Sequence, residues 1–107
     1  MAHKSDHESD VVTEWKTREK IKRPSLYKVL IHNDHYTTRE FVVDVLSSVF
    51  HHNDTDATRI MLHVHHHGVG VAGIYSFEVA EMKVQKTEAL AREQEFPLRL
   101  SLEPEDE

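Results

Sequence analysis

The sequence predicts an α/β (α+β) two-layer sandwich, in which a three-stranded antiparallel sheet carries three helices on one face. Three observations lead to this fold class. Short apolar runs stand at three places along the chain, as expected for strands. Longer stretches between them repeat apolar residues at helical spacing. The resulting order is β-α-α-β-α-β, and a sheet that buries one face needs helices to cover it.

The first strand is expected at residues 26–31, an apolar run that follows Pro24. A helix should begin near Thr37, because Thr37 and Glu40 have the spacing of a capping box. The apolar positions of this helix recur at helical spacing, at Phe41, Val42, Val45, Leu46 and Val49.

A second helix is expected after the polar break "HHNDTD", with Asp54 or Thr55 as its N-cap. It should end at Gly68, a residue type that tolerates the left-handed conformation of a helix end. Its apolar face consists of Ala57, Ile60, Met61 and Val64.

The segment "VGVAGIYSF" is expected to form the second strand, because it is rich in Val and Ile. Ser76 can then cap a third helix that continues to about Glu93. The last strand is expected in "LRLSL", residues 98–102, where Leu alternates with Arg and Ser. The apolar set of the third helix is Val79, Ala80, Val84, Leu90 and Ala91.

The chain of 107 residues is long enough for one small domain. Residues 1–24 carry six Lys or Arg, five Asp or Glu and few apolar side chains, which predicts a flexible N-terminal extension. The folded domain is expected over residues 25–104. Residues 105–107 are acidic and are expected to fray.

Composition argues against several classes of protein. The formal net charge is −6 and no basic stripe is visible, so no nucleic-acid partner is expected. No apolar run reaches the ~20 residues of a membrane-spanning helix, so no membrane partner is expected either. The serines lack the Gly-flanked elbow of a nucleophile, and "GVGVAG" lacks the Lys of a phosphate-binding loop. We therefore expect neither a catalytic reaction nor a cofactor.

Ten histidines are the unusual feature of the composition. His63 and His67 stand four residues apart on the expected second helix, a spacing that can bind a transition metal. No Cys joins them, and the HExxH pattern of zinc enzymes is absent. A small metal-binding protein is therefore an alternative, beside plain surface histidines.

Asn33 and Asp34 follow the first expected strand directly. Their side-chain oxygens are acceptors, and a chain-terminal ammonium group is a donor with three N–H bonds. A histidine at the inward end of the second helix could add a third acceptor, beside an apolar pocket. An Asx-turn that only introduces the next helix explains the same two residues equally well.

Several stretches together resemble the ClpS family of adaptor proteins of the bacterial N-degron pathway. They are "YKVLIHNDHYT", "EFVVDVL", "ATRIMLHVHHHGVGVAGIY", "EVAEMKV" and "FPLRLSLEPE". The likeness spans about residues 24–104 and implies the fold described above. It also implies a cytoplasmic adaptor without catalytic activity. Such adaptors bind substrates whose first residue is Leu, Phe, Tyr or Trp and deliver them to the AAA+ unfoldase ClpA for degradation by ClpP.

The resemblance also implies roles for individual residues. Asn33, Asp34 and His65 would hold the α-amino group of the substrate. Thr37 would approach the substrate backbone, and Glu78 and Lys83 would dock the N-domain of ClpA. The pocket for the first side chain would be lined by Ile31, Val42, Met61, Val64 and Leu98.

The chain departs from the usual family motif at three positions of the rim. His35, Thr38 and Arg39 stand where the family usually has Asp, Pro and Met. The first and last changes add positive charge beside the site of an ammonium group. We therefore hypothesise a divergent paralogue with narrowed specificity, and a cargo-free modulator of ClpA is a further alternative.

Overall fold

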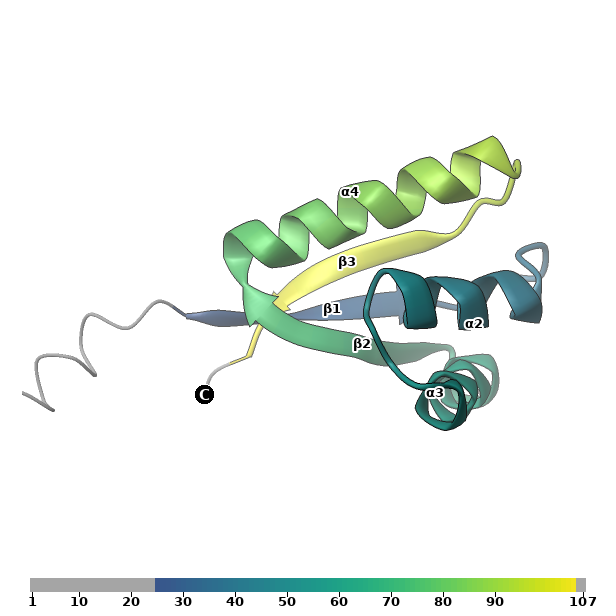
Figure 1. The fold of residues 1–107 in the computed structure, drawn as a ribbon, viewed down its shortest axis with the longest axis horizontal. Helices are drawn as coiled ribbons and strands as arrows, with labels where there is room; N and C mark the ends of the chain where they lie inside the picture. Colours follow the sequence, from purple (N-terminus) through teal and green to yellow (C-terminus); the bar gives the residue numbers. More distant parts are fainter. Residues whose placement is uncertain (1–24, 106–107) are drawn as a thin grey trace, which may run out of the picture.

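The computed structural model describes residues 25–105 (Figure 1). The extension expected over residues 1–24 and the last two residues of the acidic tail lie outside the described residues. The elements follow one another as β-α-α-β-α-β, in the expected order. Their bounds are β1 (Leu26–His32), α2 (Arg39–Ser48), α3 (Asp54–His67), β2 (Val69–Ser76), α4 (Phe77–Glu93) and β3 (Arg99–Pro104).

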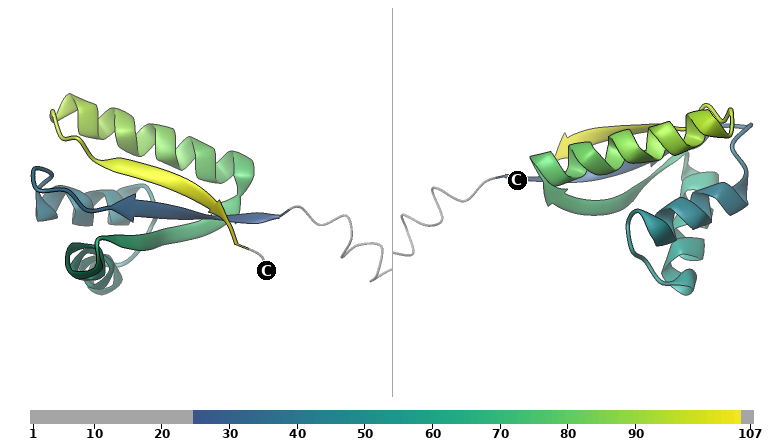
Figure 2. Two further views of the ribbon diagram at one scale, coloured as in Figure 1. Left: turned by 180° about the vertical axis from the view of Figure 1, so that it is seen from behind. Right: turned by 45° about the horizontal axis from the view of Figure 1, so that its top comes forward.

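The sheet has the strand order β2-β1-β3, and β1 is antiparallel to both neighbours. Side chains of β1 alternate between its two faces, so Val29 and Ile31 are fully buried on one of them. The same core contains side chains from all three helices. Because a single face is buried, the helices cover that face, and the predicted two-layer sandwich is confirmed. Seen from behind, β1 lies in front of α2 (Figure 2).

The helix α2 begins one residue later than predicted. Its N-cap is Thr38, whose side chain accepts a hydrogen bond from the N–H of Phe41 at 3.1 Å. Thr37 cannot serve as the cap, because its N–H and its hydroxyl both donate to the carboxylate of Asp34. The capping box expected from Thr37 and Glu40 was therefore wrong.

The N-cap of α3 was also predicted wrongly. Asn53, rather than Asp54 or Thr55, accepts from the N–H of Asp56 at 2.8 Å. All three residue types are good caps, so a tertiary contact decides between them. His52 Nε2 donates to the carbonyl oxygen of Ala72 at 2.6 Å and fixes the chain immediately before the helix.

The other end of α3 follows the prediction. Gly68 has a φ of 90°, and its N–H donates to Val64 at 2.8 Å. A left-handed residue of this kind ends a helix at no steric cost when it is Gly. The expected apolar face of α3 is confirmed, because Ala57, Ile60, Met61 and Val64 are all buried.

Ser76 is the N-cap residue of α4, although its side chain makes no cap hydrogen bond. Ala80, Val84, Leu90 and Ala91 of the expected apolar set lie in or against the core, and the set is wrong only at Val79. Val79 is 37% exposed, whereas Thr87 is fully buried together with Ala80 and Ala91. Small side chains on this buried face let α4 lie close to the sheet. No helix within residues 25–105 has the length and apolar character needed to span a membrane.

Candidate functional site

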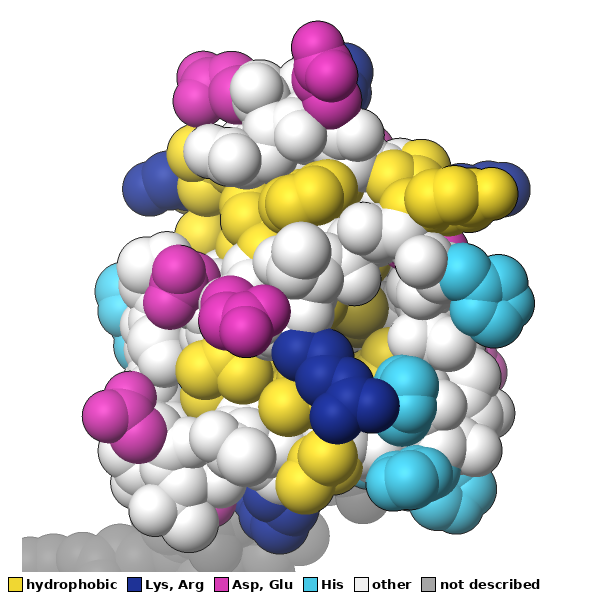
Figure 3. Space-filling model, turned by 90° about the vertical axis from the view of Figure 1, so that its right-hand side faces the viewer, with side chains coloured by type: hydrophobic (Ala, Val, Ile, Leu, Met, Phe, Trp, Pro, Cys, Tyr) yellow, Lys and Arg dark blue, Asp and Glu magenta, His cyan; other side chains and the backbone are white. Residues whose placement is uncertain are grey.

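A cavity of about 540 Å³ opens between the loop after β1, the start of α2 and the last turns of α3. Viewed from this end of the molecule, apolar side chains show around a basic side chain that lies against a histidine side chain (Figure 3). The lining residues are Asn33, Asp34, His35, Tyr36, Thr37, Thr38, Arg39, Glu40, Val42, Met61, Val64 and His65. The structure therefore gathers residues that are up to about thirty positions apart in the sequence.

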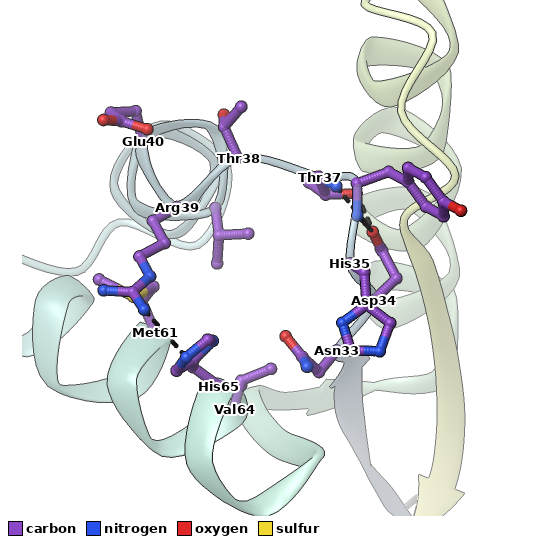
Figure 4. A pocket seen from close by; sticks show the side chains of 12 residues that line it. Asn33, Asp34, His35, Thr37, Thr38, Arg39, Glu40, Met61, Val64 and His65 are labelled. Atoms are coloured by element: carbon purple, nitrogen blue, oxygen red, sulfur yellow. Dashed lines mark hydrogen bonds between the residues drawn. The ribbon is translucent and has the colours of Figure 1, made fainter.

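Asn33 stands at the end of β1, where two elements meet. Its N–H donates to the carbonyl oxygen of Gly68 at 2.9 Å, which ties the loop after β1 to the end of α3. Its side-chain amide points into the cavity (Figure 4). No hydrogen bond holds that amide among the described residues, so its oxygen is available to a donor in the cavity.

Asp34 forms an Asx-turn. Its Oδ1 accepts from the N–H groups of Tyr36 and Thr37, both at 2.7 Å, and its Oδ2 accepts from the hydroxyl of Thr37 at 2.8 Å. A carboxylate has about four acceptor sites, so one site on Oδ2 is left. The turn that would explain Asp34 without a ligand is present, and it still leaves room for one donor.

These contacts also set the charge of Asp34. Partial burial alone would raise the pKa of its carboxyl group, but the hydrogen bonds from Thr37 and Tyr36 and the nearby charge of His35 outweigh burial and lower that pKa below its ordinary value. The group is therefore a carboxylate at neutral pH and keeps a negative charge at the cavity.

His65 lies on the last turn of α3, and its ring faces Arg39 (Figure 4). The guanidinium Nη2 of Arg39 lies 2.9 Å from Nε2 of His65. Arginine has donors only, so Nε2 is the acceptor and the ring proton sits on Nδ1. His65 thus carries its acceptor nitrogen at the cavity wall, where Arg39 occupies it. Its predicted contact with an α-amino group stays a prediction.

Three of the five residues predicted to line an apolar pocket do line this cavity. Val42, Met61 and Val64 are at most 9% exposed and form its apolar part. Ile31 and Leu98 are buried in the core and are not part of the cavity wall. Their predicted contact with a ligand side chain stays a prediction.

The four rim residues of the prediction, His35, Thr37, Thr38 and Arg39, all line the cavity. Two further lining residues were missed by the sequence analysis, namely Tyr36 and Glu40. Tyr36 is 77% exposed and stands inside the quoted motif, so its position between two predicted site residues was the available signal. Glu40 had been assigned to a capping box that does not form.

Comparison with known proteins decides the family. The family model described as "ATP-dependent Clp protease adaptor protein ClpS" matches residues 22–101. The chain belongs to the ClpS family. A ClpS adapter protein of Myxococcus xanthus is 60% identical over 106 residues, which cover 99% of each chain. One of Desulfatibacillum aliphaticivorans is 54% identical over 96 residues, which cover 90% of each.

A solved structure extends the likeness to three dimensions. The structure of Agrobacterium tumefaciens ClpS2 bound to L-phenylalaninamide matches with a TM-score of 0.75 at 41% sequence identity. The match covers 78% of this chain and all of that one. This ClpS protein therefore shares the fold of the Agrobacterium relative, whose structure was solved with a bound ligand.

Two predicted residues of this ClpS protein lie on α4, away from the cavity. Glu78 is exposed in the first turn of α4. Lys83 is half-buried: its Nζ donates to the carbonyl oxygen of Val49 at 2.6 Å and lies over the rings of Phe50 and Tyr75. Lys83 therefore caps the carboxyl end of α2, a structural role that the sequence did not indicate. Docking of a partner by these two residues stays a prediction.

The histidine cluster gives the metal alternative little support. The rings of His63 and His67 stack with 4.2 Å between centroids, and Nδ1 of His67 donates to the carbonyl oxygen of His63. Within residues 25–105, no three potential ligands gather around one point. A two-histidine site is the most that this part of the ClpS chain offers.

Proposed function

We propose that this ClpS protein binds the free N-terminal residue of substrate proteins and delivers them to the unfoldase ClpA for degradation by ClpP. In this role it works in the cytoplasm and catalyses no reaction itself. One observation carries the proposal: three acceptors, two from the loop after β1 and one from α3, line one cavity together with the apolar side chains of Val42, Met61 and Val64. The acceptors are the amide oxygen of Asn33, the open site on Asp34 and the Nε2 of His65.

This set of acceptors fits an α-ammonium group. Such a group has three donors in a tetrahedral array and no acceptor. Hydrogen bonds to a charged group contribute about 1.5–3 kcal/mol each. Burial of one large apolar side chain adds about 1.5–3 kcal/mol. Two or three such bonds with one buried side chain sum to about 4.5–12 kcal/mol before the entropy cost of association. This range spans the value of about −8 kcal/mol for micromolar affinity.

The apolar wall selects the first side chain. Val42, Met61 and Val64 offer carbon surface without a polar partner, so a charged or strongly polar side chain would lose its hydration there. Leu, Phe, Tyr and Trp, the first residues that the resemblance to the family implies, are large and apolar enough to gain from such a wall. Ile31 and Leu98 would contact a side chain long enough to reach the core.

The ligand of the Agrobacterium relative supports the same chemistry. L-phenylalaninamide has a free α-amino group and a phenyl side chain, and its carboxamide stands in for the next peptide bond. It therefore has the features of an N-terminal Phe residue.

Delivery requires a second surface, for which we propose Glu78 and Lys83 on α4. Because Lys83 also caps α2, replacing it changes the fold and the surface together. Charge reversal at Glu78 is the cleaner test of docking. Glu78→Lys should abolish capture by the ClpA N-domain and leave peptide affinity unchanged.

Fluorescence anisotropy tests the binding step. Labelled peptides that start with Leu, Phe, Tyr, Trp, Ser or Lys are compared with their N-acetylated forms. We expect binding only for the four bulky apolar residues, and only with a free terminus, because acetylation removes the charge and two donors. Equal binding of free and acetylated peptides would contradict the proposal. Capture of ClpA without binding of any peptide would favour a cargo-free modulator.

A further inference from the structure

Arg39 and His65 close one side of the cavity by contacting each other. They are 26 residues apart, at the start of α2 and in the last turn of α3, and 2.9 Å separates Nη2 from Nε2. Both side chains are exposed and both line the cavity. Figure 4 shows Arg39 extending over Met61 toward the ring of His65.

This contact occupies the acceptor that a ligand would need. A neutral imidazole ring has one acceptor nitrogen, and in His65 that nitrogen already accepts from Arg39. The guanidinium group resembles an ammonium group in the two properties that matter here, since it is cationic and donates N–H bonds without accepting any. Arg39 and a terminal ammonium group therefore compete for one lone pair.

We propose that Arg39 is an internal competitor of the ligand, and that a free amino terminus binds by displacing its guanidinium group from His65. This inference rests on the proposed function, because it assigns His65 to the ammonium site. It makes Arg39 a residue that lowers the affinity for every free terminus. It also makes His65 the residue through which Arg39 acts.

Once displaced from His65, the guanidinium group of Arg39 is free to contact the substrate. No ion pair or second hydrogen bond holds Arg39 among residues 25–105. Once released, it stays at the rim of the cavity, within reach of the residues that follow the first one of the substrate. Its planar pair of donors suits a carboxylate. In substrates with an acidic second residue, a new ion pair with Arg39 would therefore offset part of the free energy lost when Arg39 leaves His65.

The test measures the dissociation constant of a Phe-initiated peptide, free and acetylated, for four proteins. They are the unaltered chain, Arg39→Met, His65→Ala and the double variant. We expect Arg39→Met to bind the free peptide about two- to fivefold more tightly, the range that one charged contact at an exposed site gives. In the His65→Ala background the same substitution should change affinity by less than about twofold.

The matched control is Arg92→Met, which removes the same charge from an exposed arginine of α4 that does not line the cavity. It should leave affinity unchanged. If Arg39→Met does not tighten binding, or tightens it equally in both backgrounds, the proposal is overturned; the second result would assign the effect to charge repulsion alone. Failure of the proposed function looks different, because then no variant distinguishes the free peptide from the acetylated one.

Imidazole nitrogen NMR of the ligand-free protein gives a second readout. In the unaltered chain, Nε2 of His65 should give the signal of an unprotonated, hydrogen-bonded nitrogen, and Arg39→Met should shift that signal more than those of the other histidines. A proton on Nε2 of neutral His65 would overturn the proposal, whatever the peptides do. This readout decides the question even if His65→Ala abolishes binding.

Discussion

Thr37 holds the carboxylate of Asp34 with both of its donors. Its N–H donates to Oδ1 at 2.7 Å and its hydroxyl donates to Oδ2 at 2.8 Å. The two bonds fix the plane of the carboxylate, so they determine where its last acceptor site points. Thr37 is thus a positioning residue for the proposed ammonium site, in addition to any contact of its own with the substrate.

Thr37→Val keeps the shape of the side chain and removes the hydroxyl donor. We expect the free energy of unfolding to fall by about 1 kcal/mol, the usual net value of one hydrogen bond, and peptide affinity to fall several-fold. Urea denaturation and anisotropy measure the two effects. Thr58→Val, on the exposed side of α3, is the control. Unchanged affinity in Thr37→Val would remove Thr37 from the site.

The dependence of peptide affinity on pH tests which group at the cavity must stay unprotonated for the peptide to bind. The pKa of Asp34 is lowered, so its ionised form stabilises the fold fully above the unfolded value of 3.8, and this contribution is lost only as pH falls through the lower pKa of the folded state. Between about pH 7.5 and 5.5, Asp34 therefore stays charged. A loss of affinity in that window therefore does not come from protonation of Asp34.

A protonated imidazole has no acceptor for an ammonium group, so protonation of His65 should lower peptide affinity. His65→Gln, which keeps a side-chain acceptor, should give a much flatter profile. His35→Asn should keep the slope of the unaltered chain. A profile that is flat in the unaltered chain would argue against His65 as an acceptor, and one that flattens only in His35→Asn would transfer the effect to His35.

Periodicity predicted the fold well, and local signals predicted the helix starts poorly. The buried face of α3 is correct in every residue because 3.6-residue spacing alone determines which side chains share a face. The N-caps failed because Thr37 and Thr38 are equally good caps in isolation. What separates them is Asp34, which binds Thr37 from outside the helix. Contacts of this kind cannot be deduced from spacing.

In the candidate site, too, some features could be predicted from the sequence and others depend on tertiary contacts. Asn33, Asp34 and His65 were selected through the resemblance to a family, whereas local chemistry alone left an Asx-turn as an equal explanation. The contact between Arg39 and His65 could not be predicted, because it depends on the packing of α2 against α3 and on a flexible side chain. The cap that Lys83 provides for α2 joins residues 34 positions apart and was missed for the same reason.

Lys83 should contribute to stability independently of any partner. Lys83→Met keeps most of the apolar stem but removes the donor to Val49, so a carbonyl at the end of α2 loses its partner. We expect the free energy of unfolding to fall by about 1 kcal/mol. Lys86→Met, which alters an exposed lysine of the same helix, should change it by less than about 0.5 kcal/mol. Equal effects in the two variants would mean that the cap contributes nothing.

Thr87 presents the opposite case, a buried donor without a partner. Its side chain is fully buried on α4, and its Oγ1 has no hydrogen-bond partner within residues 25–105. Burial of an unpaired hydroxyl costs about 1–3 kcal/mol. Thr87→Val replaces the hydroxyl by a methyl group of similar size and should raise the free energy of unfolding by about 1 kcal/mol. A destabilised variant would show that the hydroxyl has a partner, such as a bound water molecule.

The second residue of the substrate should matter because of the charges at the rim. Peptides that start Phe-Asp, Phe-Asn and Phe-Lys differ only in the group that faces Arg39 and His35 after the first residue enters the cavity. Exposed ion pairs contribute about 0.2–1 kcal/mol, so we expect Phe-Asp to bind about two- to fivefold more tightly than Phe-Asn, and Phe-Lys to bind more weakly. These differences in affinity should become smaller at high salt, because salt screens exposed charges.

Restoring the usual family residues tests the origin of that preference. The double variant His35→Asp, Arg39→Met replaces two basic side chains by one acidic and one apolar side chain. It should lose the preference for Phe-Asp and accept Phe-Lys at least as well as Phe-Asn, while it still rejects acetylated peptides. If the three peptides keep the same order of affinity in this variant, the charge that selects the second residue lies elsewhere. Arg99, which lines a neighbouring cavity together with Asn33 and Asp34, is then the next residue to replace.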